Sequence, residues 1–377
     1  MQYFDFQGKK ISKLGFGAMR MPTLDKEGTV LDEARVDEMV DKAIAGGINY
    51  FDTAWGYHGG NSEITMGKTL KRFPRESFYL ASKFPGYDVS NMDKVEEIFN
   101  KQLEKCQVDY FDFYLFHNVC EDNIDLYLDN EKYGIYDFFI KARNEGKIKH
   151  LGFSVHGNYD TMMRFINAYG DDIEFCQVQL NYVDWDYQDA KLKVEELKKR
   201  NIPVWVMEPI RGGSLATMAS YYKDKLDSIS TCDSKSAVEW AFDYVKSIDG
   251  VGVVLSGMSN LEQIEDNLRI FDKEETLSED EINTLYSIGA HMTSSTSVMC
   301  TACRYCTENC PQGIDIPKLI ELYNECTYLS ASDAEHKIDI SKANSSPADC
   351  ISCAACEALC PQKIEIASLM TKMTDMI

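Results

Sequence analysis

The stretch YFDTAWGY, residues 50–57, begins as an apolar run and ends in polar groups. Seven further runs share its character, being short, apolar and bounded by turn-forming or polar residues. Runs of this length and composition predict buried β-strands. Together the eight predicted strands occupy residues 14–19, 50–55, 78–84, 111–117, 151–156, 175–182, 203–209 and 250–258.

Stretches with apolar residues at helical spacing separate these runs. They occupy residues 32–45, 94–106, 135–145, 190–200 and 234–247. Eight strand units that alternate with helices over about 250 residues are typical of a (β/α)8 barrel. An open doubly wound sheet is the alternative. It requires a glycine-rich loop after its first strand, and residues 15–20, GFGAMR, lack the third glycine.

Polar residues gather where the predicted strands end. In a (β/α)8 barrel the chemistry lies at the carboxyl ends of the strands, so these side chains form the candidate site. Any one of them has a structural explanation, since a buried Asp–Lys pair is structural more often than catalytic. The polar set comprises Asp52, Tyr57, Lys83, His117, Ser154, Gln177, Gln179, Asn181 and Glu208. A joint catalytic role is predicted for the first four, because they lie on adjacent strand ends.

Four of these residues resemble a known catalytic tetrad. Asp52, Tyr57, Lys83 and His117, in that order and on those strand ends, look like the tetrad of the aldo-keto reductases. The resemblance covers residues 10–285, with further matches at residues 60–63, 151–154, 177–181 and 257–267. It implies an oxidoreductase that interconverts a small-molecule carbonyl and an alcohol. Tyr57 would donate the proton, Lys83 held by Asp52 would lower the pKa of that phenol, and His117 would orient the substrate oxygen.

The same resemblance implies a nicotinamide cofactor across the barrel mouth. Ser154 and Gln177 would hold its carboxamide, and Met207 stands where an aromatic ring usually stacks on the nicotinamide. The adenosine phosphate end would lie against Gly257, Ser259, Gln263 and Asn267. Val155 replaces a usual asparagine, and the eighth loop has no Lys or Arg before Arg269, so the choice between NADH and NADPH stays open.

The last 87 residues hold two copies of the motif Cys-x2-Cys-x2-Cys-x3-Cys-Pro. Three thiolates at this spacing bind one [4Fe–4S] cluster, and the fourth, before proline, binds the other cluster. Paired zinc sites are the alternative, but they usually have two-cysteine knuckles with longer gaps. The predicted ligands are Cys300, Cys303, Cys306 and Cys360 for one cluster, and Cys350, Cys353, Cys356 and Cys310 for the other.

The predicted cluster domain resembles the two-cluster ferredoxins. Residues 316–325 between the motifs have apolar side chains at helical spacing, which favours a mainly helical variant. Cys106, Cys176 and Cys326 are predicted to be core residues. We expect a barrel domain at residues 1–288 and a cluster domain at residues 289–377, with a Ser- and Thr-rich hinge over residues 289–298.

The charge and cysteine content of the chain limit its partners and its cellular compartment. The net charge of −22 argues against nucleic acid and anionic membranes as partners. No secretory signal is evident at the start, and thirteen cysteines fit a reducing compartment, so the sequence predicts a cytoplasmic protein.

Three hypotheses about function stay open at this point. The leading one is a carbonyl/alcohol oxidoreductase whose clusters exchange electrons with an external carrier. The second is an electron-transfer protein with a non-catalytic barrel. The third is a flavin-linked reductase of a non-carbonyl acceptor, because clusters move single electrons whereas nicotinamide moves a hydride.

Overall fold

The computed structural model describes the chain except residues 26, 217–219, 231–234, 275, 295–297, 302, 329–337 and 339. The chain divides into two compact units. Unit 1 comprises Met1–Leu180, Gln188–Pro209 and Val245–Thr276. Unit 2 comprises Asn181–Tyr187, Ile210–Tyr244 and Leu277–Ile377.

Eight parallel strands in unit 1 close into a barrel, as the sequence predicted. Each strand pairs with its neighbours along the chain, and the last strand pairs with the first. Polar residues end several predicted strands early, as at β4, which stops at Asp52. The strands are β3 (Leu14–Gly17), β4 (Tyr50–Asp52), β5 (Tyr79–Phe84), β6 (Phe111–Val119), β7 (Ile148–Val155), β8 (Phe175–Gln179), β9 (Val204–Met207) and β10 (Val251–Ser256).

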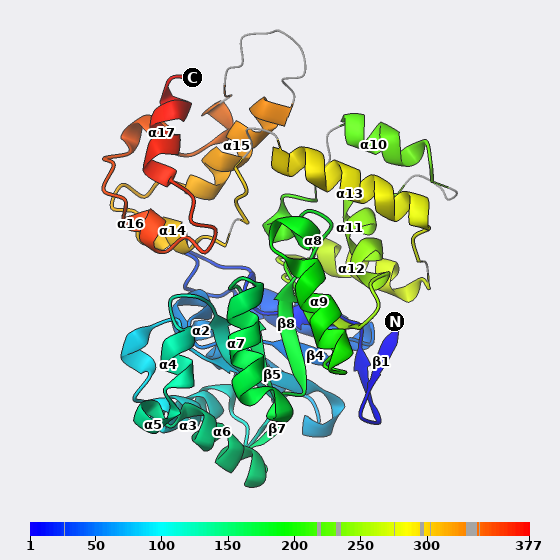
Figure 1. Cartoon of the computed structure of the whole chain (residues 1–377), viewed down its shortest axis with the longest axis vertical. Helices are drawn as coiled ribbons and strands as arrows, with labels where there is room; N and C mark the ends of the chain where they lie inside the picture. Colours follow the sequence, from blue (N-terminus) through cyan, green and yellow to red (C-terminus); the bar gives the residue numbers. More distant parts are fainter. Residues whose placement is uncertain are drawn as a thin grey trace. The chain divides into compact units, whose positions relative to one another are not determined.

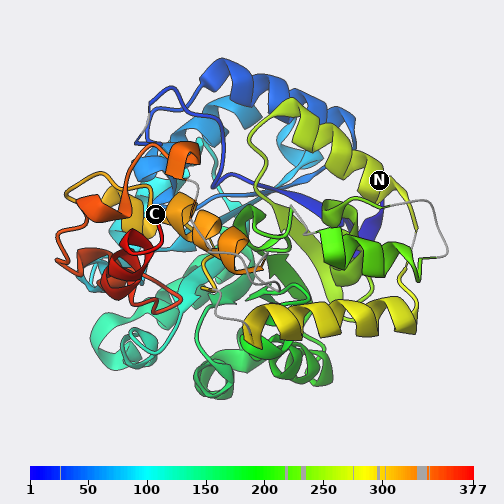
Figure 2. The ribbon, with the colours of Figure 1, turned by 90° about the horizontal axis from the view of Figure 1, so that it is seen from above.

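A helix follows each strand, and the helices of unit 1 lie outside the ring of strands (Figures 1 and 2). Side-chain caps fix several of their starts: Asp32, Asn158 and Asn260 each accept a backbone N–H of the first turn. The sequence analysis did not identify α2, α7 and α12. The helices of unit 1 are α1 (Glu33–Ala45), α2 (Asn61–Leu70), α3 (Val95–Cys106), α6 (Ile135–Asn144), α7 (Tyr159–Tyr169), α9 (Ala190–Lys199) and α12 (Leu261–Asp272), with short α4 (Ile124–Leu128) and α5 (Asn130–Tyr133) after β6. Helix α11 (Ala237–Lys246) falls mostly in unit 2.

An N-terminal hairpin that the sequence analysis did not predict closes one end of the barrel. Its strands β1 (Tyr3–Phe6) and β2 (Lys9–Ser12) are antiparallel. Gln7 and Gly8 both have positive φ, as a tight two-residue hairpin turn requires. Phe6 and Ile11 of the hairpin belong to the same buried cluster as Trp205 of β9.

Unit 2 contains helices from the region predicted to form the barrel and from the region of the cysteine motifs. They are α8 (Asp184–Tyr187), α10 (Ser220–Asp227), α13 (Glu279–Ser294), α14 (Tyr305–Glu308), α15 (Ile316–Tyr328), α16 (Ala355–Ala358) and α17 (Ile366–Thr374). The two cysteine motifs give matching pairs of helices, because α14 and α16, and likewise α15 and α17, start 50 residues apart. Leu319, Tyr323, Met370 and Met373 pack in one buried core.

The predicted hinge at residues 289–298 is partly wrong. Helix α13 continues through Gly289 to Ser294, so the predicted boundary between residues 288 and 289 falls inside this helix. A Cβ atom at Gly289 would lie 2.5 Å from the carbonyl oxygen of Tyr182. Glycine therefore permits close packing here instead of flexibility. Residues 295–297 of the predicted hinge lie outside the described part of the chain.

Candidate active site and cluster cavities

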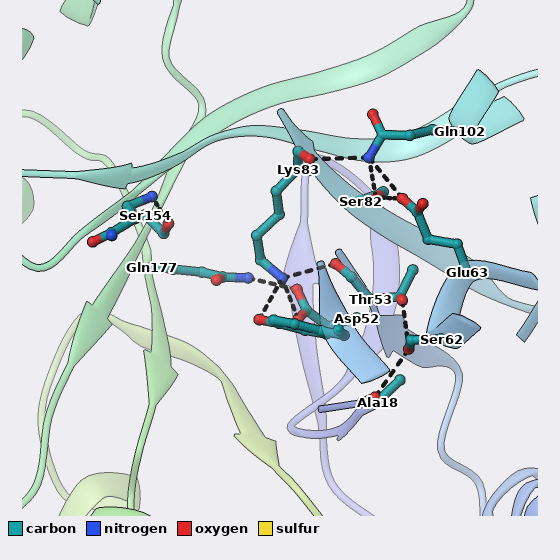
Figure 3. Close-up of polar contacts among 12 residues, drawn as sticks. Ala18, Asp52, Thr53, Ser62, Glu63, Ser82, Lys83, Gln102, Ser154 and Gln177 are labelled. Atoms are coloured by element: carbon teal, nitrogen blue, oxygen red, sulfur yellow. Dashed lines mark hydrogen bonds and ion pairs between the residues drawn. The ribbon is translucent and has the colours of Figure 1, made fainter. Parts of the chain in front are cut away.

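Lys83 and Asp52 form a buried ion pair at the ends of two neighbouring strands. The Lys83 Nζ lies 2.5 Å from Asp52 Oδ1 and also donates to the carbonyl of Thr53 at 2.9 Å. The same Nζ lies 3.3 Å from the hydroxyl oxygen of Tyr57 (Figure 3). Gln177 donates to the second oxygen of Asp52 at 2.7 Å. The ammonium group is therefore held between a carboxylate and the phenol that the sequence singled out.

His117 faces the same phenol. Its ring centroid lies 6.1 Å from that of Tyr57 and 5.2 Å from that of Tyr87, with the rings near perpendicular. Tyr127 donates to the backbone carbonyl of His117 at 2.8 Å, which anchors the end of β6. Within the described residues, the buried Nδ1 of His117 has no hydrogen-bond partner. The structure thus brings all four predicted tetrad residues together.

Burial governs the electrostatics of Tyr57. Burial, followed by the negative charge of Asp52, raises the pKa of Tyr57 well above its ordinary range. The sequence did not reveal this burial, and the predicted lowering of the Tyr57 pKa by Lys83 stays a prediction. Burial also lowers the pKa of Lys83, which Asp52 partly offsets. Burial and the nearby Lys83 hold the pKa of His117 well below its usual value.

These directions define the protonation states near neutral pH. Tyr57 carries its proton and can donate it, and His117 is a neutral imidazole. A neutral imidazole has one N–H, so it can donate one hydrogen bond to a substrate oxygen.

A buried polar network behind Lys83 was not predicted from the sequence. Glu63, which is fully buried, accepts from Ser82 and Gln102 at 2.6 Å each and from Lys105 at 2.7 Å. Gln102 also donates to the backbone carbonyl of Lys83 at 3.0 Å (Figure 3). The network holds the backbone of Lys83 in place. Its only sequence signal was the match at residues 60–63, which assigned no role to Glu63.

The two residues predicted to hold a carboxamide have the right chemistry. Ser154 and Gln177 are each 1% exposed and lie opposite each other on adjacent strands. The Ser154 hydroxyl accepts the N–H of Asn118, which leaves its proton to donate, and Gln177 uses its NH₂ on Asp52, which leaves its carbonyl oxygen to accept. A carboxamide needs one donor and one acceptor, so the pair fits a nicotinamide.

Of the residues predicted for the adenosine end, Gly257 and Ser259 lie in the turn between β10 and α12, and Gln263 and Asn267 lie in α12. Gln263 accepts the N–H of Ser259 at 2.7 Å, and Ser259 donates to the carbonyl of Arg20 at 2.7 Å. The side chain of Arg20 also lies 3.1 Å from where a Cβ of Gly257 would stand. Arg20 comes from the loop after β3, and nothing in the sequence of the eighth loop indicates this cation. Asn267 instead turns inward and donates to Ser256 at 3.0 Å.

Strand β9 ends at Met207, which is partly exposed, and Glu208 follows with φ of +54°. The charge of Glu208 contributes to the raised pKa of Tyr57. Trp55, Gly56 and Tyr87 line an open hollow of about 1380 Å³ that continues to α3.

Each set of four predicted cluster cysteines lines one cavity. Cys300, Cys303, Cys306 and Cys360 surround a cavity of about 310 Å³, whose other walls include Pro317 and Ile320. The second cavity, of about 360 Å³, is lined by Cys310, Cys350, Cys353 and Cys356 together with Ile316 and Met370. Each cavity combines three cysteines of one motif with the last cysteine of the other motif, as the spacing predicted.

The cavity chemistry fits iron–sulfur clusters. Burial and the neighbouring Cys303 and Cys300 sulfurs raise the pKa of the Cys306 thiol to about 12. Bound iron must displace these protons, and the crowding of sulfurs that disfavours thiolates without metal is what a thiolate-bound cluster requires. Cys326 packs against the core of this region and lines neither cavity.

The sequence pattern of the aldo/keto reductase family matches residues 13–290. The chain belongs to this family. A second pattern, that of a 4Fe–4S dicluster domain, matches residues 299–365.

Known members share the barrel. L-galactose dehydrogenase of Arabidopsis thaliana is 25% identical over 295 residues, which cover 73% of this chain and 88% of that protein. The holo form of an aldo-keto reductase from Bacillus halodurans superimposes with a TM-score of 0.62 at 21% identity, covering 76% of this chain and 95% of that one. A Klebsiella pneumoniae aldo-keto reductase in complex with NADPH gives a TM-score of 0.60 at 18% identity and covers 76% and 94% of the two chains.

As an aldo/keto reductase with a 4Fe–4S domain, the chain is a redox enzyme that carries iron–sulfur clusters. Its family uses NAD(P)H and acts on small molecules. A search of the described residues found no helix with the length and apolar character that a membrane span needs.

Proposed function

We propose that the chain interconverts a carbonyl and an alcohol with a nicotinamide cofactor, with Tyr57 as the proton donor. The observation that carries this proposal is the convergence of Asp52, Tyr57, Lys83 and His117, with Lys83 Nζ 3.3 Å from the Tyr57 hydroxyl. A bound reduced nicotinamide supplies the hydride. The residues of the chain do the remaining work on the substrate oxygen.

The side chains divide that work. As negative charge develops on the substrate oxygen, the Tyr57 phenol transfers its proton there. Lys83 stabilises the resulting phenolate, and Asp52 keeps Lys83 charged and oriented. Neutral His117 donates a hydrogen bond to the same oxygen and sets its direction. Ser154 and Gln177 orient the cofactor, while Met207, Gly257, Ser259 and Gln263 line its remaining path.

The proposal includes two [4Fe–4S] clusters. Cluster 1 takes Cys300, Cys303, Cys306 and Cys360, and cluster 2 takes Cys350, Cys353, Cys356 and Cys310. The support is that each set lines its own cavity. Each cluster would hold one electron at a time, and the two clusters would exchange electrons with an external carrier.

The test is anaerobic mixing of the iron-loaded protein with NADH and with NADPH. Cofactor oxidation is followed at the nicotinamide band and cluster reduction at the visible iron–sulfur band, with an aldehyde or ketone panel as acceptors. We expect Tyr57→Phe to lower carbonyl reduction by 10²-fold or more, in the range typical of a lost general acid. Tyr79→Phe is the matched control, because Tyr79 begins β5 at the opposite end of that strand from Lys83.

Several outcomes would contradict the proposal. Undiminished turnover in Tyr57→Phe would remove the assigned proton donor. Cluster bleaching without any carbonyl turnover in the native protein would favour pure electron transfer. Dependence of both signals on added flavin would favour the flavin-linked reductase.

A further inference from the structure

Arg211 connects a barrel loop to the first cysteine motif through a buried charge. It follows β9 by four residues, and its side chain is 3% exposed. Its two terminal nitrogens donate to the backbone carbonyls of Cys300, at 3.2 Å, and Met299, at 3.3 Å. Arg211 has a φ of +48°, a conformation that costs free energy for a residue with a side chain. The backbone of Arg211 is thus strained where its guanidinium contacts the loop at the start of the first cysteine motif.

A fully buried carboxylate balances this guanidinium from its other side. Asp184 of α8 contacts the Nε of Arg211 at 3.1 and 3.2 Å. Asn181 donates to Asp184 at 2.6 Å, and its own side-chain oxygen accepts the N–H groups of Val183 and Asp184. The pair is therefore directional: the positive group faces the cysteine loop, and the negative group lies behind it.

The second motif provides an internal comparison. Cys350 matches Cys300 at an offset of 50 residues, and its own N–H bonds to the carbonyl of Pro347. In the part of the chain that the structure describes, no Arg or Lys side chain donates to the carbonyl of Asp349 or Cys350. The residue before Cys350 is instead an acid, Asp349, which accepts the N–H of Ser346. The two cluster loops thus differ in the sign of the charge beside their first cysteine.

We propose that the Arg211–Asp184 pair raises the reduction potential of cluster 1 above that of cluster 2, so that cluster 1 fills first. The inference rests on the two-cluster assignment made under the proposed function. Reduction adds one electron to a cluster, and a nearby positive charge in a low-dielectric interior stabilises that added charge. Hydrogen bonds to the backbone of a ligand residue act in the same direction.

The pair also makes Arg211 and Asp184 positioning residues between the barrel loops and cluster 1. Asp184 lies in the segment after β8, which carries Gln177, and Arg211 lies in the segment after β9, which ends at Met207. Both segments belong to unit 2, and they hold the loop of cluster 1.

The test is a redox titration of the full, anaerobically reconstituted chain, followed by electron paramagnetic resonance. Asp184→Asn leaves the guanidinium uncompensated, so the potential of one cluster should rise. Arg211→Gln leaves a buried carboxylate, so the same potential should fall. Arg211→Lys retains the charge and should shift the potential less than Arg211→Gln. The potential of the other cluster should change little in all three variants.

The opposite signs separate electrostatic tuning from simple damage to the fold. Lys235 and Asp243 provide a control, since they form a buried pair at 2.7 Å in the same unit. Lys235→Met and Asp243→Asn should leave both potentials unchanged. Equal or same-direction shifts in Asp184→Asn and Arg211→Gln, or a joint shift of both clusters, would overturn the proposal. If Arg211→Gln fails to retain iron, Asp184→Asn decides, and an unchanged or lower potential refutes the idea.

These readouts do not depend on turnover. A protein that reduces no carbonyl but shows the opposite shifts would refute the proposed enzymatic activity and leave the tuning intact. A native protein with only one titrating cluster would refute the tuning and leave the carbonyl chemistry intact.

Discussion

Substitution of Lys83 by methionine tests whether Asp52 is a true buried charge whose partner is needed for folding as well as for chemistry. Methionine has nearly the length of the lysine stem, so it fills the same space and leaves little cavity. Among the described residues, the Asp52 carboxylate, 3% exposed, would then keep the Gln177 amide as its side-chain donor. The substitution therefore isolates the loss of the ammonium.

The expected cost follows from this geometry. Removing one partner of a buried pair costs about 3–5 kcal/mol, because the remaining charge stays in the interior without compensation. The Thr53 carbonyl also loses its donor, which adds about 1 kcal/mol. The double variant Asp52→Asn/Lys83→Met removes both charges. It should recover about half or more of the lost stability, because no uncompensated charge is left.

The assay combines urea denaturation at constant pH with turnover measurements on the same preparations. Stability should fall in Lys83→Met and partly return in the double variant, while carbonyl reduction should stay low in both because Tyr57 lacks its ammonium neighbour. Single and double variants of equal stability would refute the claim that the charge of Asp52 is costly. Recovery of activity in the double variant would refute the role given to Lys83.

Three further predictions follow from burial, packing and ligand assignment. Burial lowers the pKa of His156 to about 4, against an unfolded value near 6.5. The native protein should therefore lose on the order of 3 kcal/mol of stability as pH falls from about 6.5 to 4. Denaturation at several pH values should show that the stability of His156→Gln depends less on pH, and an equal pH dependence in both proteins would contradict this. Gly289→Ala should destabilise the protein by about 1–3 kcal/mol, because the new Cβ meets the Tyr182 carbonyl, and an unchanged melting temperature would show that the helix moves freely. Cys360→Ala should reduce the iron content of the reconstituted protein from about eight to about four or fewer, whereas Cys326→Ala should retain full iron, and equal loss in both would refute the assignment.

The barrel was predictable because its signals are local. All eight apolar runs became strands in the predicted order, since short buried strands between turn residues are visible in a single sequence. The meeting of Asp52, Lys83 and His117 also followed, because parallel strands in a barrel end on the same rim. The pairing of cysteines into two cavities followed from the cysteine spacing alone.

The features that were not predicted depend on contacts between residues that lie far apart in the sequence. Glu63 and Gln102 meet only because α2 and α3 pack against the barrel, and neither segment contains a sequence signal for this contact. Arg20 reaches the turn after β10 from the other end of the chain. The raised pKa of Tyr57 was not predicted, because the sequence indicates a nearby ammonium group but not the depth at which the phenol is buried.

The shared cysteines have a consequence for how this protein can change over generations. Each cavity takes its fourth sulfur from the motif that builds the other cavity, so neither Cys310 nor Cys360 serves its own motif. A truncation that deletes residues 350–377 would strip Cys360 from the remaining cavity as well. Simple shortening of the gene therefore cannot remove one cysteine-lined cavity and leave the other with its four cysteines.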